Sequence, residues 1–331
     1  MVNGWMNKLM NGNNLNLKYL WKLIRGGNLL FIVLIQYFFK YLILDSLINE
    51  KMVFFSGATL ASQRILFFLM VLSTVFIAAA GYIINDISDV RADKINKPGE
   101  NIIGEIISLN LAKTLYYSFN VLGILLGFFC FYFLGKPTLI SVQLLMVMLL
   151  YLYAVEYQCK SFWGNVMVAF AASMVVLIVW LFEFYMLLIA KSTYLLSDNF
   201  SILLIVGFAG FAFLFTLLRE WSKDLQDFDG DSAVGCRNLM IKIGIKKGTL
   251  MLGIALIISS ILIIVWQILL FLNTNSHLLF TSIYFVLQVL IYTFLLPLIL
   301  KANGKNDYHK ISNGLKLIMA AGMLFMIFFR I

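Results

Sequence analysis

The sequence predicts an all-α fold in which a polytopic bundle of helices spans a membrane. Hydrophobic residues make up 62% of the 331 residues and charged residues only 12%, a balance that is typical of membrane proteins. The chain contains only three prolines, which favours long uninterrupted helices. No alternation of apolar and polar residues in the sequence competes with this prediction by indicating strands or a barrel.

Nine apolar runs account for the predicted helices, since a helix needs about twenty apolar residues to cross a bilayer. Lys40 interrupts the first run and the last run is short, so these two fit the criterion least well. The runs are Leu29–Leu47, Ile65–Ile84, Leu115–Leu134, Leu139–Val155, Val166–Ala190, Ile202–Leu218, Leu250–Leu272, Leu278–Leu300 and Leu315–Phe329.

The chain divides into a short N-terminal segment and one membrane domain. Residues 1–27 are predicted to stay on the cytoplasmic side, where Leu15–Arg25 can form an amphipathic helix on the membrane surface. Residues 28–331 form a single transmembrane domain. We expect this domain to lie in the inner, cytoplasmic membrane.

The distribution of charge predicts the orientation of the bundle. With the N-terminus inside, most of the 25 Lys and Arg residues fall in inner segments, as membrane proteins generally require. The long loops 85–114 and 219–249 then face the cytoplasm. The net charge of +9 reflects this asymmetry and an anionic inner leaflet, so we predict no nucleic-acid partner.

Two acidic motifs with the same spacing stand out against this apolar background. Asp86, Asp89 and Asp93 follow one apolar run at i, i+3 and i+7, which places them on one face of a continuing helix. The same spacing recurs after a later run at Asp224, Asp227 and Asp231. The two motifs indicate an internal repeat of two halves, divided near residues 135–200. A solvated helix end would explain one motif, but two on the same predicted side favour a shared cation site.

The residue types point to a site for Mg²⁺ and a diphosphate. Carboxylates and the amide oxygen of Asn85 are the hard ligands that Mg²⁺ prefers, together with phosphate oxygens. Basic residues near the motifs can contact the phosphates directly. A ligand with a diphosphate head and a long apolar tail fits this membrane boundary, as a polyprenyl diphosphate does. The basic residues are Arg91, Lys94, Lys97, Arg219 and Lys223.

Other polar residues within the apolar runs favour structural roles. Glu183 lies deep in the fifth run, and we interpret it as a structural hydrogen bond or ion pair. The spacing of Cys130, Cys159 and Cys236 indicates neither a metal cluster nor a disulfide framework.

The motifs carry a family resemblance. Asn85 to Asp93 resembles the Asn-Asp-x-x-Asp-x-x-x-Asp signature of the UbiA superfamily of intramembrane prenyltransferases, and Asp227 to Asp231 resembles its second motif. The stretches 93–98 and 219–235 look most like the branch that contains digeranylgeranylglyceryl phosphate synthases and their bacterial relatives. In the segment 152–165, Gln158 stands where the family usually has a basic residue, and Lys160 follows two positions later.

The resemblance implies nine helices around a central cavity that opens laterally to lipid. It also implies two Mg²⁺ ions: one would be held by Asn85, Asp86, Asp89 and Asp93, the other by Asp227 and Asp231 with help from Asp224 and Glu220. These ions would neutralise the departing diphosphate. Tyr153 would stabilise the allylic cation, and Lys160 and Asn165 would approach the substrates.

The predicted activity is Mg²⁺-dependent transfer of a prenyl group from a polyprenyl diphosphate to an acceptor. The acceptor is a lipid, such as a geranylgeranylglyceryl-phosphate-like lipid, or an aromatic quinone precursor. Two other classes compete. A CDP-alcohol phosphotransferase would need a compact Asp-Gly-x-x-Ala-Arg pattern, which the sequence lacks. A cation-coupled transporter would place its acids near the midplane, whereas these lie at the ends of apolar runs.

Overall fold

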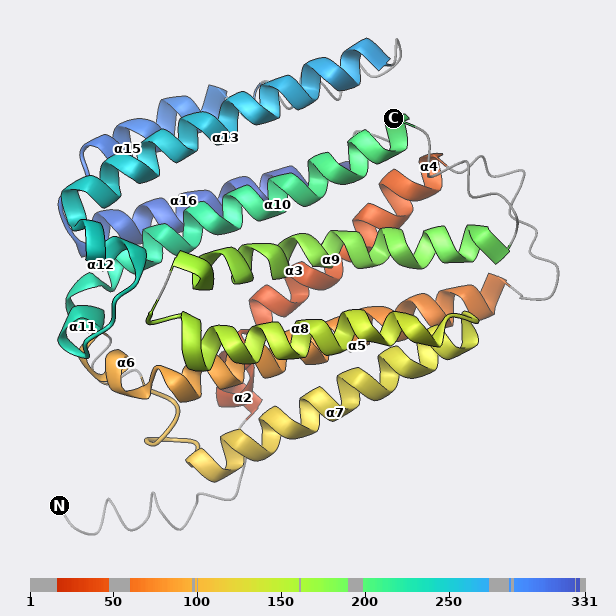
Figure 1. The fold of residues 1–331 in the computed structure, drawn as a ribbon, viewed down its shortest axis with the longest axis horizontal. Helices are drawn as coiled ribbons and strands as arrows, with labels where there is room; N and C mark the ends of the chain where they lie inside the picture. Colours follow the sequence, from red (N-terminus) through yellow and green to blue (C-terminus); the bar gives the residue numbers. More distant parts are fainter. Residues whose placement is uncertain are drawn as a thin grey trace.

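The computed structural model is a bundle of long helices that run along one direction (Figure 1). It describes residues 17–47, 60–96, 99, 101–160, 162–189, 199–273, 286, 289–324 and 326–327. Within these ranges the chain is nearly all helical and the only β pairing is an isolated bridge between Ile103 and Ile107, so the predicted all-α class is confirmed.

The first part of the bundle begins with two helices that meet at a sharp corner, where Arg25 has a left-handed φ of 51°. The helices in this part, up to the turn before residue 162, are α2 (Leu17–Leu23), α3 (Gly26–Phe38), η1 (Phe39–Leu44), α4 (Asp45–Leu47), α5 (Leu60–Ser88), α6 (Val90–Asn96), α7 (Leu109–Phe133), η2 (Pro137–Leu139), α8 (Ile140–Leu152) and η3 (Tyr153–Tyr157).

The second part has the same pattern of long apolar helices with short helices between them. Its helices are α9 (Phe162–Ile189), α10 (Asn199–Gln226), α11 (Phe228–Ala233), α12 (Leu239–Ile243), α13 (Ile245–Asn273), η5 (Ile291–Leu295), α15 (Leu296–Leu300) and α16 (Lys305–Leu324).

Seven helical segments of the described chain are long and apolar enough to cross a membrane, so the protein is an integral membrane protein. They correspond to the first seven predicted runs. The eighth predicted run lies partly outside the described residues, and the ninth falls on α16 and a few residues beyond it. The total of nine spans therefore stays a prediction. The seven are Gly26–Leu47, Gln63–Ser88, Leu109–Phe133, Pro137–Tyr157, Phe162–Leu188, Asn199–Gln226 and Ile245–Leu272.

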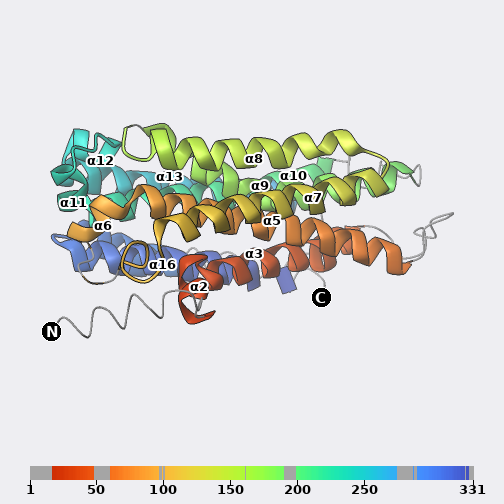
Figure 2. The same cartoon turned by 90° about the horizontal axis from the view of Figure 1, so that it is seen from below.

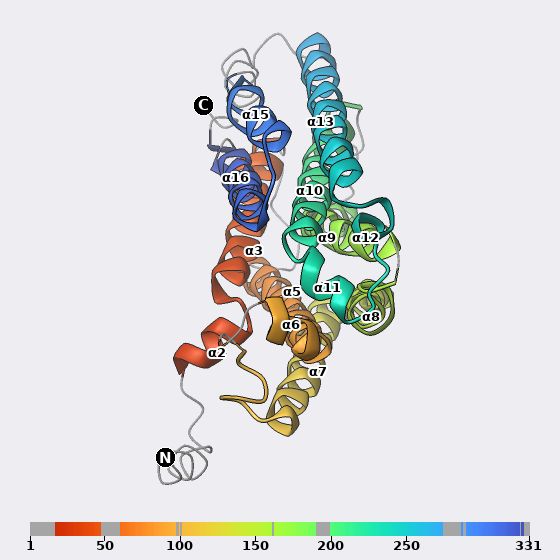
Figure 3. The same cartoon turned by 90° about the vertical axis from the view of Figure 1, so that its left-hand side faces the viewer.

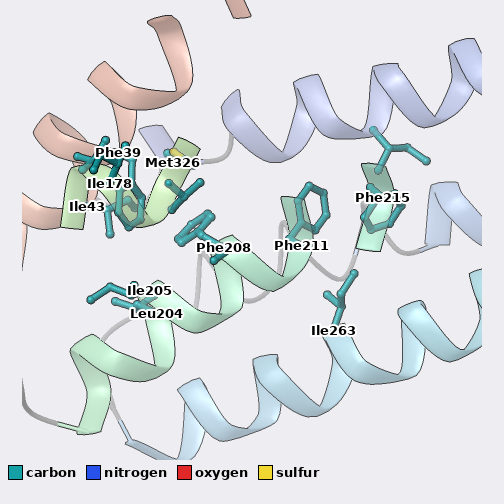
Figure 4. Close-up of a cluster of buried hydrophobic side chains, with 14 of the residues drawn as sticks. Phe39, Ile43, Ile178, Leu204, Ile205, Phe208, Phe211, Phe215, Ile263 and Met326 are labelled. Atoms are coloured by element: carbon teal, nitrogen blue, oxygen red, sulfur yellow. The ribbon is translucent and has the colours of Figure 1, made fainter. Parts of the chain in front are cut away.

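A large apolar cluster fixes the half of the bundle that surrounds α10. Phe208, Phe211 and Phe215 project from successive turns of α10, and Ile263 of α13 belongs to the same cluster (Figure 4). The rings of Phe211 and Phe215 lie 4.5 Å apart between their centroids. Gly322 of α16 lacks a Cβ, and one added there would lie 2.7 Å from the Phe211 ring, so this glycine lets α16 approach α10. The position of α10 matters because its last turns carry one acidic motif.

A buried ion pair explains the charged residues that interrupt two apolar runs. The ammonium of Lys40 contacts the carboxylate of Glu183, and both side chains are almost entirely buried. Asp45 Oδ1 lies 3.5 Å from the same ammonium. A buried charge is tolerated only with a partner, so the predicted structural role of Glu183 is confirmed.

Two polar turns meet at one end of the bundle. Helices α6, α11 and α12 gather there, as Figures 1 and 2 both show. Cys159, in the turn after η3, forms a disulfide with Cys236, which follows α11, with 4.6 Å between the two Cα atoms. The expectation that no disulfide forms was therefore wrong. The separation of 77 positions along the chain hides the proximity of the two cysteines from the sequence.

Candidate active site

A cavity of about 840 Å³ runs from the end that carries α6 and α11 into the bundle. Its polar end is formed where α5 passes into α6 and α10 into α11, and these two pairs lie side by side in Figure 3. Its deeper walls are apolar. They are formed by side chains that include Ile32, Ile77, Met146, Val168, Ile178 and Met319.

The first acidic motif keeps its helical register through the break between α5 and α6. The backbone N–H of Asp89 donates to Asn85 O at 2.9 Å, and that of Asp93 donates to Asp89 O at 2.8 Å. Asp86, Asp89 and Asp93 therefore stay on one face, and all three line the cavity. The i, i+3, i+7 spacing therefore places the three aspartates on one helix face, as the sequence predicts.

Three neutral or basic side chains orient these carboxylates. Asn85 donates to Asp89 Oδ2 at 2.8 Å. Gln158 donates to both oxygens of Asp89, at 2.8 and 2.7 Å. Arg25 forms an ion pair with Asp86 at 2.8 Å. The π-turn η3 positions Gln158, since the Gln158 N–H donates to Tyr153 O, five residues earlier, at 2.8 Å.

The second motif lies at the end of α10 and in α11. Asp231 donates its backbone N–H to Asp227 O at 3.0 Å, and Asp227 to Lys223 O at 2.8 Å, so these residues also keep a helical register. Asn165 of α9 donates to Asp224 Oδ2 at 3.0 Å. Asp224, Asp227 and Asp231 all line the cavity.

Asn96 joins the two motifs. Its amide donates to Asp231 Oδ1 at 3.2 Å, and its Oδ1 accepts from the backbone N–H of Gly230 at 3.1 Å. Gly230 must be glycine for this contact, because a Cβ there would lie 2.1 Å from Asn96 Oδ1. Lys305 of α16 donates to Asn96 O at 2.5 Å, which ties a third element to the same residue.

The carboxylates of the two motifs lie close enough to repel each other electrostatically. Burial, together with the negative charges of Asp227 and Asp89, raises the pKa of Asp231 to about 7. Burial also raises the pKa of Asp89, and repulsion from Asp93 adds to this increase. The hydrogen bond from Gln158 lowers the pKa, and the combined result is about 6. A cation between the motifs would relieve this repulsion.

The donor set fits Mg²⁺, which needs only a few carboxylates together with water or phosphate oxygens. Within the described residues no three acidic, His or Cys side chains already converge on one point, so the carboxylates line a wider space than a closed metal cage. Gln158 Oε1 is buried beside them and has no hydrogen-bond partner in the described part of the chain. It can accept a hydrogen bond from a metal-bound water.

Comparison with known proteins decides the family. Residues 52–314 match the model of the UbiA prenyltransferase family. The chain belongs to this family. It is 32% identical to digeranylgeranylglyceryl phosphate synthase of Saccharolobus solfataricus over 65% of this chain and 67% of that one. It is 29% identical to the synthase of Sulfurisphaera tokodaii, over 68% of this chain and 76% of that one. The protein is accordingly a prenyltransferase.

Two solved structures share the fold of this UbiA-family chain. One comes from work on digeranylgeranylglyceryl phosphate synthase in membranes; it has a TM-score of 0.61 and 23% identity, over 94% of this chain and 97% of that one. The other is a UbiA homologue from Archaeoglobus fulgidus bound to DMAPP and Mg²⁺, with a TM-score of 0.57 and 15% identity, over 94% of this chain and 98% of that one.

The structure brings most of the predicted site residues of this UbiA-family protein to the cavity, but not all of them. Arg91 and Lys94 are exposed and are not among the residues that line it. Lys160 points to solvent and pairs with Glu156 at 2.6 Å. Lys97 lies outside the described residues. Asn165 does not line the cavity, but it donates a hydrogen bond to Asp224, which does. Those that line the cavity are Asn85, the six motif aspartates, Tyr153, Arg219, Glu220 and Lys223.

Arg25 and Asn96 were missed as site residues. Arg25 was assigned only to the surface helix, yet it pairs with Asp86. A basic residue directly before the first apolar run, on the side predicted for the motifs, was the available signal. Asn96 had a weaker one, since it follows Asp93 by three residues and so continues the same helix face.

Proposed function

We propose that this protein transfers a prenyl group from a polyprenyl diphosphate to a glyceryl phosphate lipid in a Mg²⁺-dependent reaction. One observation carries the proposal: two acidic motifs face each other at the polar end of a cavity whose deeper walls are apolar. The diphosphate head and apolar tail of the donor match these two parts. The names of the relatives support a glyceryl phosphate lipid as acceptor.

The acidic residues would hold the metal and the donor head. Asn85, Asp86, Asp89 and Asp93 would form one side of the site, and Asp227 and Asp231 the other, with Asp224 and Glu220 in support. When bound, Mg²⁺ neutralises charge that develops on the leaving diphosphate; we propose two ions. Lys223 supplies positive charge from the same wall.

The apolar walls would exclude water while the bond between the prenyl carbon and the diphosphate oxygen breaks. Tyr153 lines the cavity near Asp89 and Asp224, where its ring can face the allylic cation. The acceptor hydroxyl then forms the new ether bond, and its proton would pass to the departing diphosphate. Gln158 and Asn165 would keep Asp89 and Asp224 oriented throughout.

We also propose that the site faces the cytoplasm and that residues 28–331 act as one domain built from two motif-bearing halves. The excess of Lys and Arg in the predicted inner segments supports the orientation. Trp21 and Lys22 of α2 are exposed and line the cavity, which suits a helix at the membrane surface beside its entrance.

Neutralising single motif carboxylates tests the function. In Asp89→Asn and Asp227→Asn, we expect kcat/KM for prenyl transfer to fall about a hundredfold or more, because each loses a metal ligand. Diphosphate release from a prenyl diphosphate and product mass would be measured with purified protein in bilayer nanodiscs. Asp229→Asn is the matched control, since Asp229 lies in α11 beside the motif but is exposed and does not line the cavity. Full activity in both motif variants would refute the assignment.

A further inference from the structure

The cavity has a second charged region besides the acidic motifs. Lys22 of α2, Arg219 of α10 and Lys316 of α16 all line it. We call these three residues the basic lobe. None of them belongs to the acidic motifs, and α16 carries neither motif. The same cavity therefore carries cationic side chains that lie outside the acidic motifs, as well as the motif carboxylates.

Lys316 keeps its charge available. Its ammonium donates to Asn28 Oδ1 at 3.1 Å, and an amide oxygen does not neutralise it. Lys316 makes no ion pair with any residue in the described part of the chain. The side chain is thus positioned by a neutral partner, as a cation that binds an external anion would be.

Arg219 adds further uncompensated charge beside Lys316. Arg219 Nη1 lies 3.3 Å from Glu220 Oε1. Lys223 contacts the same carboxylate at 2.8 and 3.0 Å. The single negative charge of Glu220 is therefore shared by two cations. Arg219 Nε is buried and has no hydrogen-bond partner among the described residues. The charges of Arg219 and Lys316 also repel each other. Both features favour an anion between them.

The basic lobe lies where an amphiphile would enter. Trp21 is 56% exposed, and Lys22 and Lys316 are exposed too, although all three line the cavity. The cavity therefore reaches the surface between the corner of α2 and α3 and the side of α16. An anionic lipid whose chains stay in the bilayer can place its head group there, with its hydroxyl directed inward.

We propose that the basic lobe binds the phosphate monoester head of the lipid acceptor, with Lys316 as its principal anchor. This inference rests on the proposed function and assigns the acceptor's phosphate to a different region from the donor's diphosphate. A phosphate monoester carries between one and a half and two negative charges near neutral pH, which matches the excess of cations. The lobe would select phosphorylated lipids over neutral alcohols or phenols.

Steady-state kinetics of Lys316→Met test the assignment. The substrates are a geranylgeranyl ether of glycerol phosphate, the same ether without its phosphate, and a prenyl diphosphate. We expect KM for the phosphorylated acceptor to rise about tenfold or more, since a charge-assisted hydrogen bond is lost. KM for the neutral ether and for the prenyl diphosphate should change less than twofold. Lys316→Arg should recover most of the affinity for the phosphorylated acceptor.

Two further variants make the result decisive. Asn28→Asp nearly preserves size but sets a carboxylate beside Lys316, so it should raise KM for the phosphorylated acceptor as well. Lys310→Met on the exposed face of α16 is the matched control and should leave all three KM values unchanged. An unchanged acceptor KM in Lys316→Met, or an equal rise in the donor KM, would overturn the inference. Wild-type protein that prenylates no glyceryl phosphate lipid would instead refute the proposed function.

Discussion

Gln158 shows how one residue can set the chemistry of a carboxylate. Its amide donates to both oxygens of Asp89 at 2.8 and 2.7 Å and opposes the effect of burial, which raises the pKa of Asp89 to about 6. A basic residue there would neutralise Asp89 through an ion pair. The neutral amide orients Asp89 but leaves its negative charge for a metal ion.

Replacing Gln158 by Leu should weaken the response to Mg²⁺. The variant keeps a similar volume but removes the hydrogen bonds that orient Asp89, each worth roughly 1.5–3 kcal/mol when charged. We expect the Mg²⁺ concentration for half-maximal prenyl transfer to rise about tenfold, measured by diphosphate release across a Mg²⁺ titration. Lys160→Met, two residues away and in solvent, should match wild type. Equal Mg²⁺ dependence in wild type and Gln158→Leu would exclude this role.

At the scale of elements, the contact between α6 and α11 determines whether the two motifs form one site. Each motif is only the end of a long helix, and the distance between the two ends depends on the turn that joins them. Asn96 of α6 joins the two elements, because it forms hydrogen bonds with the Asp231 side chain and the Gly230 backbone of α11. Lys305 of α16 donates a further hydrogen bond to the backbone carbonyl of Asn96. The hydrogen bonds between α6 and α11 thus depend on Asn96 and on the absence of a side chain at Gly230.

Gly230→Ala should separate the two helices. A Cβ 2.1 Å from Asn96 Oδ1 must displace the Asn96 amide from Gly230 and Asp231, the residues through which it joins α6 to α11, so we expect prenyl transfer to fall at least tenfold. Asn96→Ala removes the atoms that clash. A double-mutant cycle should therefore be non-additive, with Gly230→Ala costing much less in the Asn96→Ala background. Activities and thermal midpoints of the four proteins test this, and additive effects would count against the contact.

At the scale of the whole molecule, periodic features were predictable and pairings were not. Apolar runs of about twenty residues and the i, i+3, i+7 spacing depend on local geometry, so seven spans and two cavity-lining motifs followed from the sequence. Contacts between residues far apart in the chain produce no periodic pattern in the sequence from which they could be predicted. Arg25 meets Asp86 across 61 residues, and Cys159 meets Cys236 across 77. Lys160 was misjudged because the π-turn η3 directs Gln158, not Lys160, to the motif.

The acidic site should also make the stability of the whole bundle depend on pH and Mg²⁺ together. Asp89 and Asp231 have folded-state pKa values of about 6 and about 7, above the ordinary 3.8. A carboxyl with a raised pKa favours the folded state while protonated, and that contribution is lost as pH rises through the folded pKa. Metal-free protein should therefore lose thermal stability as the pH rises from about 4 to about 7, with little further loss above that.

Mg²⁺ should offset this loss, and more strongly at higher pH. Binding must displace the protons on Asp89 and Asp231, which at pH 6 costs about tenfold in affinity for a group of pKa 7. The Mg²⁺-induced rise in melting temperature, measured in nanodiscs with a prenyl diphosphate analogue present, should thus be larger at pH 8 than at pH 6. Asp231→Asn removes one of the titrating groups and should flatten the pH dependence of the metal-free protein. A Mg²⁺ effect that is equal at both pH values, or greater at pH 6, would mean that the ion binds elsewhere than between the two motifs.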